Sequence, residues 1–192
     1  MPSWWDNRTN VDEFRTWVRG IDDPSRKHVR EYLIGKGYTS FLDVAAGLCE
    51  DFDGFKRDGK GISYVAMDFT DKFVAHNRAR GVNIVKADCN AEFPFTDSFF
   101  DVAYLRHVIE HLPYYDNCIS EMIRVADKEV VITFFLPSVD RKDDEIRVVD
   151  NLNHNFYSKP KMAKFLKANP KVKSIRWEPY GIDEEILYIE LA

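Results

Sequence analysis

Three aspartates and one glycine carry the clearest chemical signal in the sequence. Asp43, Asp68 and Asp88 each lie at the end of a short apolar run, and Gly47 follows the first of these runs. Because ligands of open α/β sheets bind at the carboxyl ends of the strands, we expect these residues to line one site. Glycine lets the backbone approach a ligand closely, and Asp68, 21 residues after Gly47, is placed to accept both hydroxyls of a ribose. Asp88 is placed to accept from an exocyclic adenine amine. The pattern predicts a nucleoside-containing cofactor, whereas Gly47 taken alone fits an ordinary strand-to-helix turn equally well.

The histidines form a second group of candidate residues. His107, Glu110 and His111 stand at positions i, i+3 and i+4, which would share one face of a helix. Together with His154 they could bind a divalent metal, but we expect no metal here, and we expect His111 to bond a backbone carbonyl. His107 directly follows a strand, so its neutral imidazole could take a proton from a hydroxyl acceptor. His154, on a later loop, is the alternative base.

The elements that must position these residues alternate between strands and helices. This alternation predicts a doubly wound α/β fold, with a seven-stranded, mostly parallel, Rossmann-like sheet, a C-terminal antiparallel hairpin and two N-terminal helices. The expected strands cover residues 41–45, 62–67, 83–86, 100–105, 129–135, 172–177 and 185–191. The expected helices cover residues 11–19, 24–35, 50–55, 71–80, 115–125 and 158–167. Thr70 is expected to cap the fourth helix, Pro179 and Gly181 to lie in the last turn, and residues 140–153 to form a charged loop.

Length and composition are those of one globular domain. The 192 residues include 45% hydrophobic and 31% charged residues. We expect a single domain over 1–192, with N-terminal helices in 1–38, a cofactor-binding core in 39–136 and acceptor-side elements in 137–192.

Charge and hydropathy exclude several classes of partner. The net charge is −5, and the basic cluster Arg26, Lys27, His28 and Arg30 is interpreted as the solvated face of a helix. We therefore expect no broad nucleic-acid binding. No apolar run approaches ~20 residues, so neither membrane binding nor a signal segment is expected.

The three cysteines predict free thiols. Cys49, Cys89 and Cys118 are odd in number and lack the spacing of metal ligands. This cysteine usage favours a reducing, cytoplasmic location.

Five segments resemble motifs of the class I S-adenosylmethionine (SAM)-dependent methyltransferases. The likeness is to the small-molecule branch, with a type 11-like domain, and runs from about residue 41 to residue 135. The similar segments are residues 41–47 (FLDVAAG), 64–68 (YVAMD), 88–95 (DCNAEFPF), 98–103 (SFFDVA) and 106–112 (RHVIEHL).

The resemblance implies SAM as the cofactor and a role for each matching residue. The backbone of residues 45–47 would line the methionine end of SAM, Asp68 would hold the ribose, and Phe69 would pack on the adenine. Ala45 and Cys49 stand where the family usually has glycine, and their side chains are expected to reduce the room for the cofactor. The implied cofactor residues are Asp43, Ala45, Ala46, Gly47, Asp68, Phe69, Asp88, Cys89 and Arg106.

Methyl transfer to a small polar acceptor is the function that these patterns favour. The segment Tyr104-Leu105-Arg106 lacks the Asn/Asp-Pro-Pro-aromatic turn that similar enzymes use on amino groups. We therefore favour an oxygen acceptor on a metabolite, sugar or glycan precursor. The acceptor pocket is expected to use the N-terminal helices and residues 140–153, with Trp4, Trp5 and Tyr157 as candidates for a lid.

Three other functions compete with this interpretation. A non-catalytic SAM-fold binding module would explain the altered glycine turn. A metal-assisted 2′-O-methyltransferase would use the acid and histidine cluster. A nicotinamide-dependent oxidoreductase is disfavoured by the closing hairpin and by residues 92–102. The sequence makes no prediction of oligomeric state.

Overall fold

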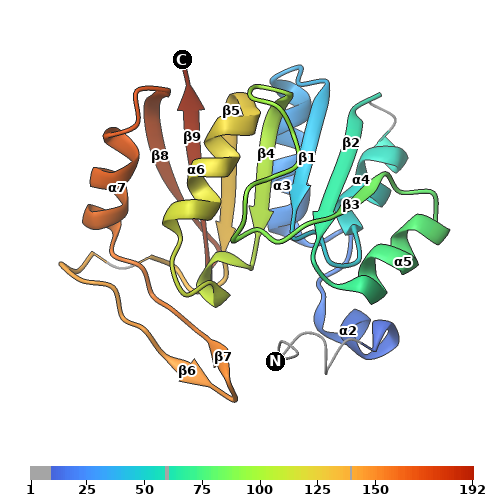
Figure 1. Cartoon of the computed structure of the whole chain (residues 1–192), viewed down its shortest axis with the longest axis horizontal. Coiled ribbons are helices and arrows are strands. Elements are labelled where there is room, and N and C mark those ends of the chain that lie inside the picture. Colours follow the sequence, from blue (N-terminus) through green and yellow to red (C-terminus); the bar gives the residue numbers. More distant parts are fainter. Residues whose placement is uncertain (1–9, 59–60, 139) are drawn as a thin grey trace. The chain divides into compact units, whose positions relative to one another are not determined.

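The computed structural model describes residues 10–58, 61–138 and 140–192 (Figure 1). The chain divides into two compact units, Met1–Cys89 and Asn90–Ala192. The sequence-based division into residues 1–38, 39–136 and 137–192 stays a prediction.

The first unit is built on three parallel strands in the order β3-β2-β1. All but the first residue of β1 and of β2 are buried, as expected where helices cover both faces of a parallel sheet. The strands are β1 (Ser40–Val44), β2 (Ser63–Asp68) and β3 (Ile84–Lys86). The helices are α2 (Val11–Trp17), α3 (Pro24–Gly35), α4 (Glu50–Asp58) and α5 (Asp71–Ala79).

Of the basic cluster of α3, Lys27 is exposed as predicted, whereas Arg26 and Arg30 are buried, so the prediction was wrong for the two arginines. Arg26 is 8% exposed and pairs with Asp51, and Arg30 is 1% exposed, with its Nε 2.6 Å from Asp58 Oδ2. A Cβ at Gly54 would lie 2.6 Å from Arg30 Nη1, so glycine leaves the space that this guanidinium fills. Acids on the neighbouring helix α4 make the burial of both arginines possible.

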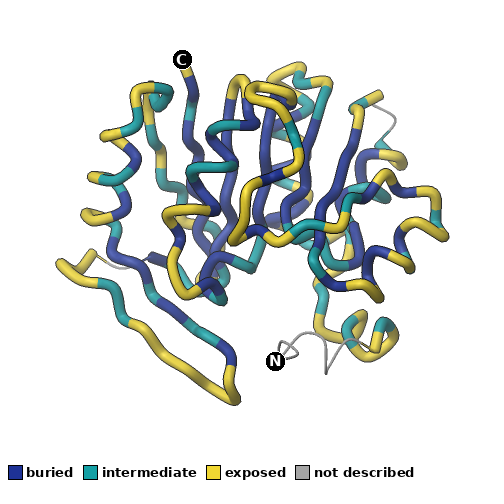
Figure 2. The backbone as a smooth tube through the Cα atoms, in the orientation of Figure 1, coloured by how far each residue is buried: buried dark blue, intermediate teal, exposed yellow. Residues whose placement is uncertain are grey.

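The second unit is built on four strands in the order β4-β5-β9-β8. β4 and β5 are parallel, whereas β5–β9 and β9–β8 are antiparallel. The strands are β4 (Phe100–Arg106), β5 (Ala126–Phe134), β8 (Val172–Tyr180) and β9 (Glu184–Leu191). The helices are η1 (Ile109–His111, 3-10), α6 (Asp116–Val125) and α7 (Lys159–Lys167). Figure 2 shows β4, β5 and β9 buried along most of their length.

Residues 140–153 are not a simple loop. They contain a two-stranded hairpin of β6 (Val148–Val149) and β7 (Leu152–Asn153). Its two turn residues, Asp150 and Asn151, have φ angles of 51° and 64°. Positive φ at both positions is the requirement of a type I′ turn, which Asp and Asn meet more readily than other non-glycine residues.

The predicted fold class is confirmed: seven main strands, mostly parallel, with a closing antiparallel pair and helices packed on them. One local prediction was wrong: Pro179 lies in β8, an edge strand where proline is tolerated, rather than in the turn. Thr70 takes the predicted N-cap position of α5, without a side-chain cap bond, and residues 109–111 form a 3-10 turn. Among the described residues, no helix has both the length and the apolarity needed to cross a membrane.

Candidate functional site

The turn after β1 has left-handed backbone where the sequence resemblance expects glycines. Ala45, Gly47 and Cys49 have φ angles of 53°, 55° and 54°. An L-residue in this region costs roughly 1–2 kcal/mol, and such strain concentrates at functional sites. The two residues that depart from the family pattern therefore keep the backbone conformation for which glycine is suited.

Asp68 joins this turn to the end of β2. Its Oδ2 accepts from Gly47 N at 2.9 Å and its Oδ1 accepts from Thr70 N at 2.8 Å. Burial raises the pKa of Asp68, and the backbone N–H groups of Thr70 and Gly47 oppose that rise. Each carboxylate oxygen has a second lone pair, so Asp68 can still accept two hydroxyl hydrogen bonds. These features fit a ligand that presents two neighbouring hydroxyl groups.

Helix α5 supports the same turn through residues that sequence reasoning missed. Asn77 is fully buried and its Nδ2 donates to Gly47 O at 2.7 Å and to Phe73 O at 2.9 Å. Arg80 Nη1 donates to Leu48 O at 2.7 Å. Both contacts span at least 30 residues of sequence, so no local pattern could have indicated them.

Phe14 of α2 lies against the turn after β1, residues 45–49, called the glycine turn below. A Cβ built on Gly47 would lie 3.3 Å from Phe14 Cε1, and the Phe14 ring lies 4.7 Å from that of Phe73. Glycine is therefore favoured at position 47 for two reasons: its φ is positive, and the Phe14 ring leaves little room for a side chain.

The remaining cofactor candidates of the first unit differ in their exposure. Asp43 is buried and accepts from Tyr64 Oη, and burial raises its pKa to about 8, with Asp51 adding to the rise. Its carboxyl group therefore supports the interior. Phe69 is half-buried, Cys89 is buried and Asp88 is exposed.

In the second unit, Arg106 and His107 meet Glu184. Arg106 Nη2 lies 3.0 Å from Glu184 Oε1, and His107 Nε2 lies 2.6 Å from the same oxygen. Arg106 Nη1 donates to His107 Nδ1 at 3.0 Å, because a guanidinium has only donors. Neutral His107 therefore carries its proton on Nε2, and the lone pair on its Nδ1 accepts a hydrogen bond from the Arg106 guanidinium. His107 also has a φ of 56°, and its backbone N–H donates to Thr133 O.

The other two histidines lie around Phe135. The ring of His111 is 5.1 Å from that of Phe135 and 5.2 Å from that of His154. His111 Nδ1 donates to Asn153 O at 2.7 Å, which confirms the predicted carbonyl bond, and burial lowers its pKa to about 4. His154 is half-buried, and its ring nitrogens make no hydrogen bond with any other described residue.

Glu110 anchors the segment between β4 and the β6–β7 hairpin. It is fully buried, and its Oε1 accepts from the backbone N–H of Phe135 at 2.6 Å and of Leu136 at 3.1 Å. Burial raises the pKa of Glu110 to about 7. The backbone N–H of Asn155 donates to the Glu110 carbonyl at 2.9 Å, which fixes the segment that follows β7 and carries His154.

Two further predictions concern a metal and a lid. Across 10–58, 61–138 and 140–192, no three His, Cys, Asp or Glu side chains are grouped so as to hold a metal ion. Tyr157 is 2% exposed and its hydroxyl donates to Leu112 O at 2.7 Å, so it supports the interior and the lid assignment was wrong. Trp4 and Trp5 lie outside the described residues.

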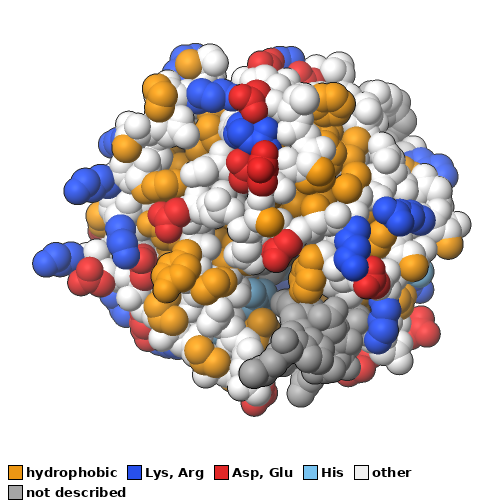
Figure 3. All heavy atoms as spheres, viewed as in Figure 1, with side chains coloured by type: hydrophobic (Ala, Val, Ile, Leu, Met, Phe, Trp, Pro, Cys, Tyr) orange, Lys and Arg blue, Asp and Glu red, His pale blue; other side chains and the backbone are white. Residues whose placement is uncertain are grey.

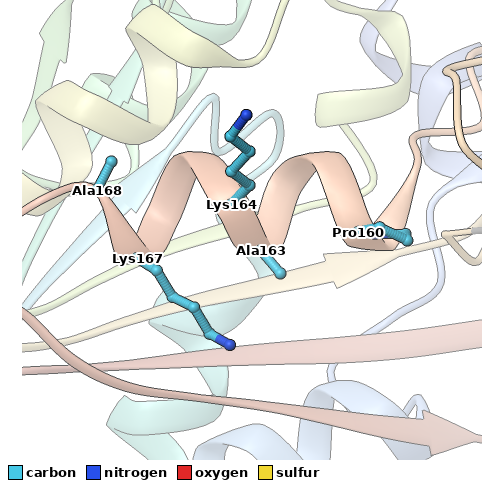
Figure 4. Close-up of a pocket in the computed structure, with 5 residues that line it drawn as sticks. All are labelled: Pro160, Ala163, Lys164, Lys167 and Ala168. Atoms are coloured by element: carbon cyan, nitrogen blue, oxygen red, sulfur yellow. The ribbon is translucent and has the colours of Figure 1, made fainter.

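A surface depression lies on α7, lined by Pro160, Ala163, Lys164, Lys167 and Ala168 (Figure 4). Lys164 and Lys167 project from opposite sides of the helix in this view. The lining contains no acid, histidine or thiol, and it supplies none of the groups described above.

Comparison with known proteins gives this arrangement a family. Residues 42–134 match the family described as methyltransferase domain. This stretch contains the glycine turn, Asp68, Arg106 and His107. Residues 42–134 form a SAM-dependent methyltransferase domain. The family resemblance seen in the sequence is thereby confirmed, and SAM is the cofactor of the domain, as predicted.

Solved structures share the fold of this chain at low sequence identity. DesVI of Streptomyces venezuelae matches with a TM-score of 0.72 and 10% identity, covering 95% of this chain and 98% of that one. Magnesium protoporphyrin IX methyltransferase of Synechocystis PCC 6803, solved with S-adenosylhomocysteine, matches with a TM-score of 0.68 and 14% identity, covering 98% and 96%.

A sterol 4-C-methyltransferase of Caenorhabditis elegans is 25% identical over 169 residues. The match covers 83% of this chain and 50% of that protein, so this chain spans about half the length of the curated relative that it matches.

Proposed function

We propose that this chain transfers the methyl group of SAM to an oxygen atom of a small acceptor molecule. The observation that carries the proposal is the Asp68 carboxylate, which clamps Gly47 and Thr70 and retains acceptor capacity for a ribose. The left-handed turn of Ala45, Gly47 and Cys49 supports the same role.

When bound, SAM supplies a methyl group on a positively charged sulfur. The residues of the first unit hold the nucleoside: Asp68 binds hydroxyls, and Asn77 and Arg80 keep the turn in shape. Methyl transfer depends largely on alignment of the nucleophile, so a rigid turn contributes directly to the rate. The family match leaves the acceptor open.

His154 is the better of the two candidate bases. A general base needs an available lone pair, and the Nδ1 lone pair of His107 accepts from Arg106. The His154 ring makes no hydrogen bond with other described residues, so it can take the proton of an acceptor hydroxyl. We assign His107 to positioning, with Arg106 and Glu184.

An acceptor with an apolar body is a second candidate beside a sugar or other polar metabolite. The β6–β7 hairpin next to His154 exposes Ile146, Val148 and Val149 by 56%, 64% and 51%. Hydrophobic side chains also gather at the lower left of Figure 3, where this hairpin lies in Figure 1. The C. elegans relative is named for a sterol acceptor. Hydroxylated sterols therefore belong in an acceptor screen beside sugars and small metabolites.

Charge and cysteine usage support the remaining parts of the proposal. Figure 3 shows Lys and Arg interspersed with Asp and Glu, which is unfavourable for broad nucleic-acid binding. Cys49, Cys89 and Cys118 are free and buried, which supports a reducing cytoplasmic location.

Calorimetric titration with SAM and S-adenosylhomocysteine tests the cofactor site. We expect micromolar binding in the wild-type chain and none in Asp68→Ala. Asp71→Ala is the matched control, because its side chain is 80% exposed at the start of α5, and it should bind like the wild type. Absence of binding in a folded wild-type chain, or equal binding in Asp68→Ala, would contradict the proposal.

Steady-state kinetics with an acceptor found in the screen tests whether His154 is the general base. His154→Gln should lower kcat by about 10²–10⁴-fold and remove the acid limb of its pH profile, as loss of a general base does. His107→Gln should retain that limb. The reverse result would return the role of base to His107. SAM binding without turnover on any acceptor would favour the non-catalytic binding module.

A further inference from the structure

The side of the glycine turn to which a Cβ on Gly47 would point is in contact with Phe14. A Cβ atom built on Gly47 would lie 3.3 Å from Cε1 and 3.8 Å from Cζ of Phe14. A glycine at such a turn allows close approach by a ligand, and here an aromatic ring makes that approach. The ring and a cofactor cannot occupy this space together.

The helix that carries Phe14 is weakly held. Helix α2 has seven residues, none of them buried, whereas isolated helices shorter than about 12 residues are marginal in water. Only Val11 and Phe14 are half-buried within it, and the Phe14 ring packs on Phe73 at 4.7 Å. The Phe14 ring therefore contributes to the docking of α2 on α5.

The connection to α3 would let α2 move alone. Val18 is extended, and a Cβ at Gly20 would meet nothing within 4 Å. Beyond this point the chain is fixed independently: Asp23 caps α3, and Ile21 O accepts from Arg30 Nη1 at 3.3 Å. Displacement of α2 therefore leaves the anchored start of α3 in place.

The docked helix also leaves a polar atom unsatisfied. His76 Nε2 is buried without a hydrogen-bond partner among the described residues. Burial lowers the pKa of His76, and so do Arg80 and, from α2, Arg15, whereas Asp12 of α2 acts in the opposite direction. A buried, unpaired nitrogen weakens the docked arrangement.

We propose that α2 and SAM compete for the glycine turn, with Phe14 covering Gly47 until the cofactor displaces the helix. This inference rests on the proposed SAM site. A cover of this kind lowers the apparent affinity by the fraction of chains in which the turn is open. Removing the ring should therefore strengthen binding, the opposite of the effect expected for a side chain that stacks on the cofactor.

Calorimetric titration of the wild-type and Phe14→Ala chains with S-adenosylhomocysteine shows whether removal of the ring strengthens or weakens binding. We expect Phe14→Ala to bind about tenfold more tightly, as for an open state populated ~10% of the time. Glu13→Ala, an exposed truncation on the same helix, should leave affinity unchanged. Amide exchange in the wild-type chain is the second measurement, and residues 11–17 should exchange faster when S-adenosylhomocysteine is added.

Two results would overturn the inference while leaving the proposed function intact. One is weaker binding by Phe14→Ala, and the other is slower exchange of residues 11–17 in the presence of S-adenosylhomocysteine. Both would mean that α2 closes on the cofactor. Failure of wild-type and Phe14→Ala chains alike to bind would instead contradict the proposed SAM site, and this inference with it.

Discussion

Two non-glycine residues of the glycine turn have left-handed backbone. Ala45 and Cys49 both have positive φ, as Gly47 does. Their side chains are half-buried and buried, respectively, so the turn combines left-handed backbone with added volume. The chain retains the shape of the site at a cost in stability.

Replacing Ala45 with glycine should relieve part of that cost. We expect Ala45→Gly to raise the free energy of unfolding by about 1 kcal/mol, because glycine adopts positive φ without penalty. Ala46→Gly is the control: its φ is not positive, so added chain entropy should lower stability by about 0.5–1 kcal/mol. Urea denaturation measures both, and a loss of stability in Ala45→Gly would refute the strain argument.

Residue types revealed only part of the site. Asp68 and Gly47 could be predicted because a carboxylate and a glycine at strand ends have a direct chemical meaning. Glu184, Asn77 and Phe14 could not, because each reaches the site from an element far away in sequence. Glu184, for example, contacts Arg106 across 78 residues. No local spacing encodes such contacts.

Among the elements, strong periodicity and clear end signals were predicted well. Helix α3 has the expected bounds because Pro24 and Asp23 mark its start. The β6–β7 hairpin was missed because its turn is Asp-Asn rather than a glycine pair, and each strand has two residues. Such short strands have no measurable alternation of polar and apolar residues.

The docking of α2 should depend on pH through His76. Because its pKa is lowered in the docked state, docking is favoured above the ordinary pKa of histidine, about 6.5, and is progressively lost as the pH falls below it. We expect amide exchange of residues 11–17, corrected for its intrinsic pH dependence, to accelerate below about pH 6.5. His76→Gln should show no such acceleration. An unchanged profile in the variant would assign the effect to another group.

At the scale of the whole chain, two buried acids lower stability as the pH rises, whereas the buried His111, whose pKa is lowered to about 4, acts in the opposite direction. Burial raises the pKa of Glu110 to about 7 and that of Asp43 to about 8. A raised pKa means that the folded chain holds the proton more tightly than the unfolded chain does. The resulting stabilisation is complete below the unfolded pKa and is lost as the pH rises through the folded value.

Glu110→Gln should remove one part of this dependence. Between about pH 4.5 and 7, the Glu110 carboxyl should account for a loss of roughly 3 kcal/mol in the free energy of unfolding. The difference in the free energy of unfolding between the wild type and the variant, measured by denaturation, should therefore change by that amount across this range, because His111 contributes equally to both proteins. Asp43 likewise contributes equally to both. Parallel curves for the two proteins would mean that Glu110 is ionised in the folded chain.

The fold class could be predicted from the sequence, whereas the register of the strands could not. Alternation of apolar strands with amphipathic helices predicts a parallel sheet, because such strands must be covered on both faces. The pairing of Val131 with Tyr188 or of Ile175 with Ile189 depends on packing between distant segments. The separation of the two units is likewise invisible in composition, since no linker marks residue 89.

The position of β9 has a consequence for synthesis of the chain. β9 lies between β5 and β8, so one edge of β5 lacks its partner until β9 has been translated. About 50 residues separate Phe134 from Glu184, and ribosomes add roughly 5–20 residues per second, so that edge stays open for some 3–10 seconds. An apolar strand with free backbone groups is a target for aggregation during that interval. Nascent chains of this protein are thus candidates for chaperone binding at β5.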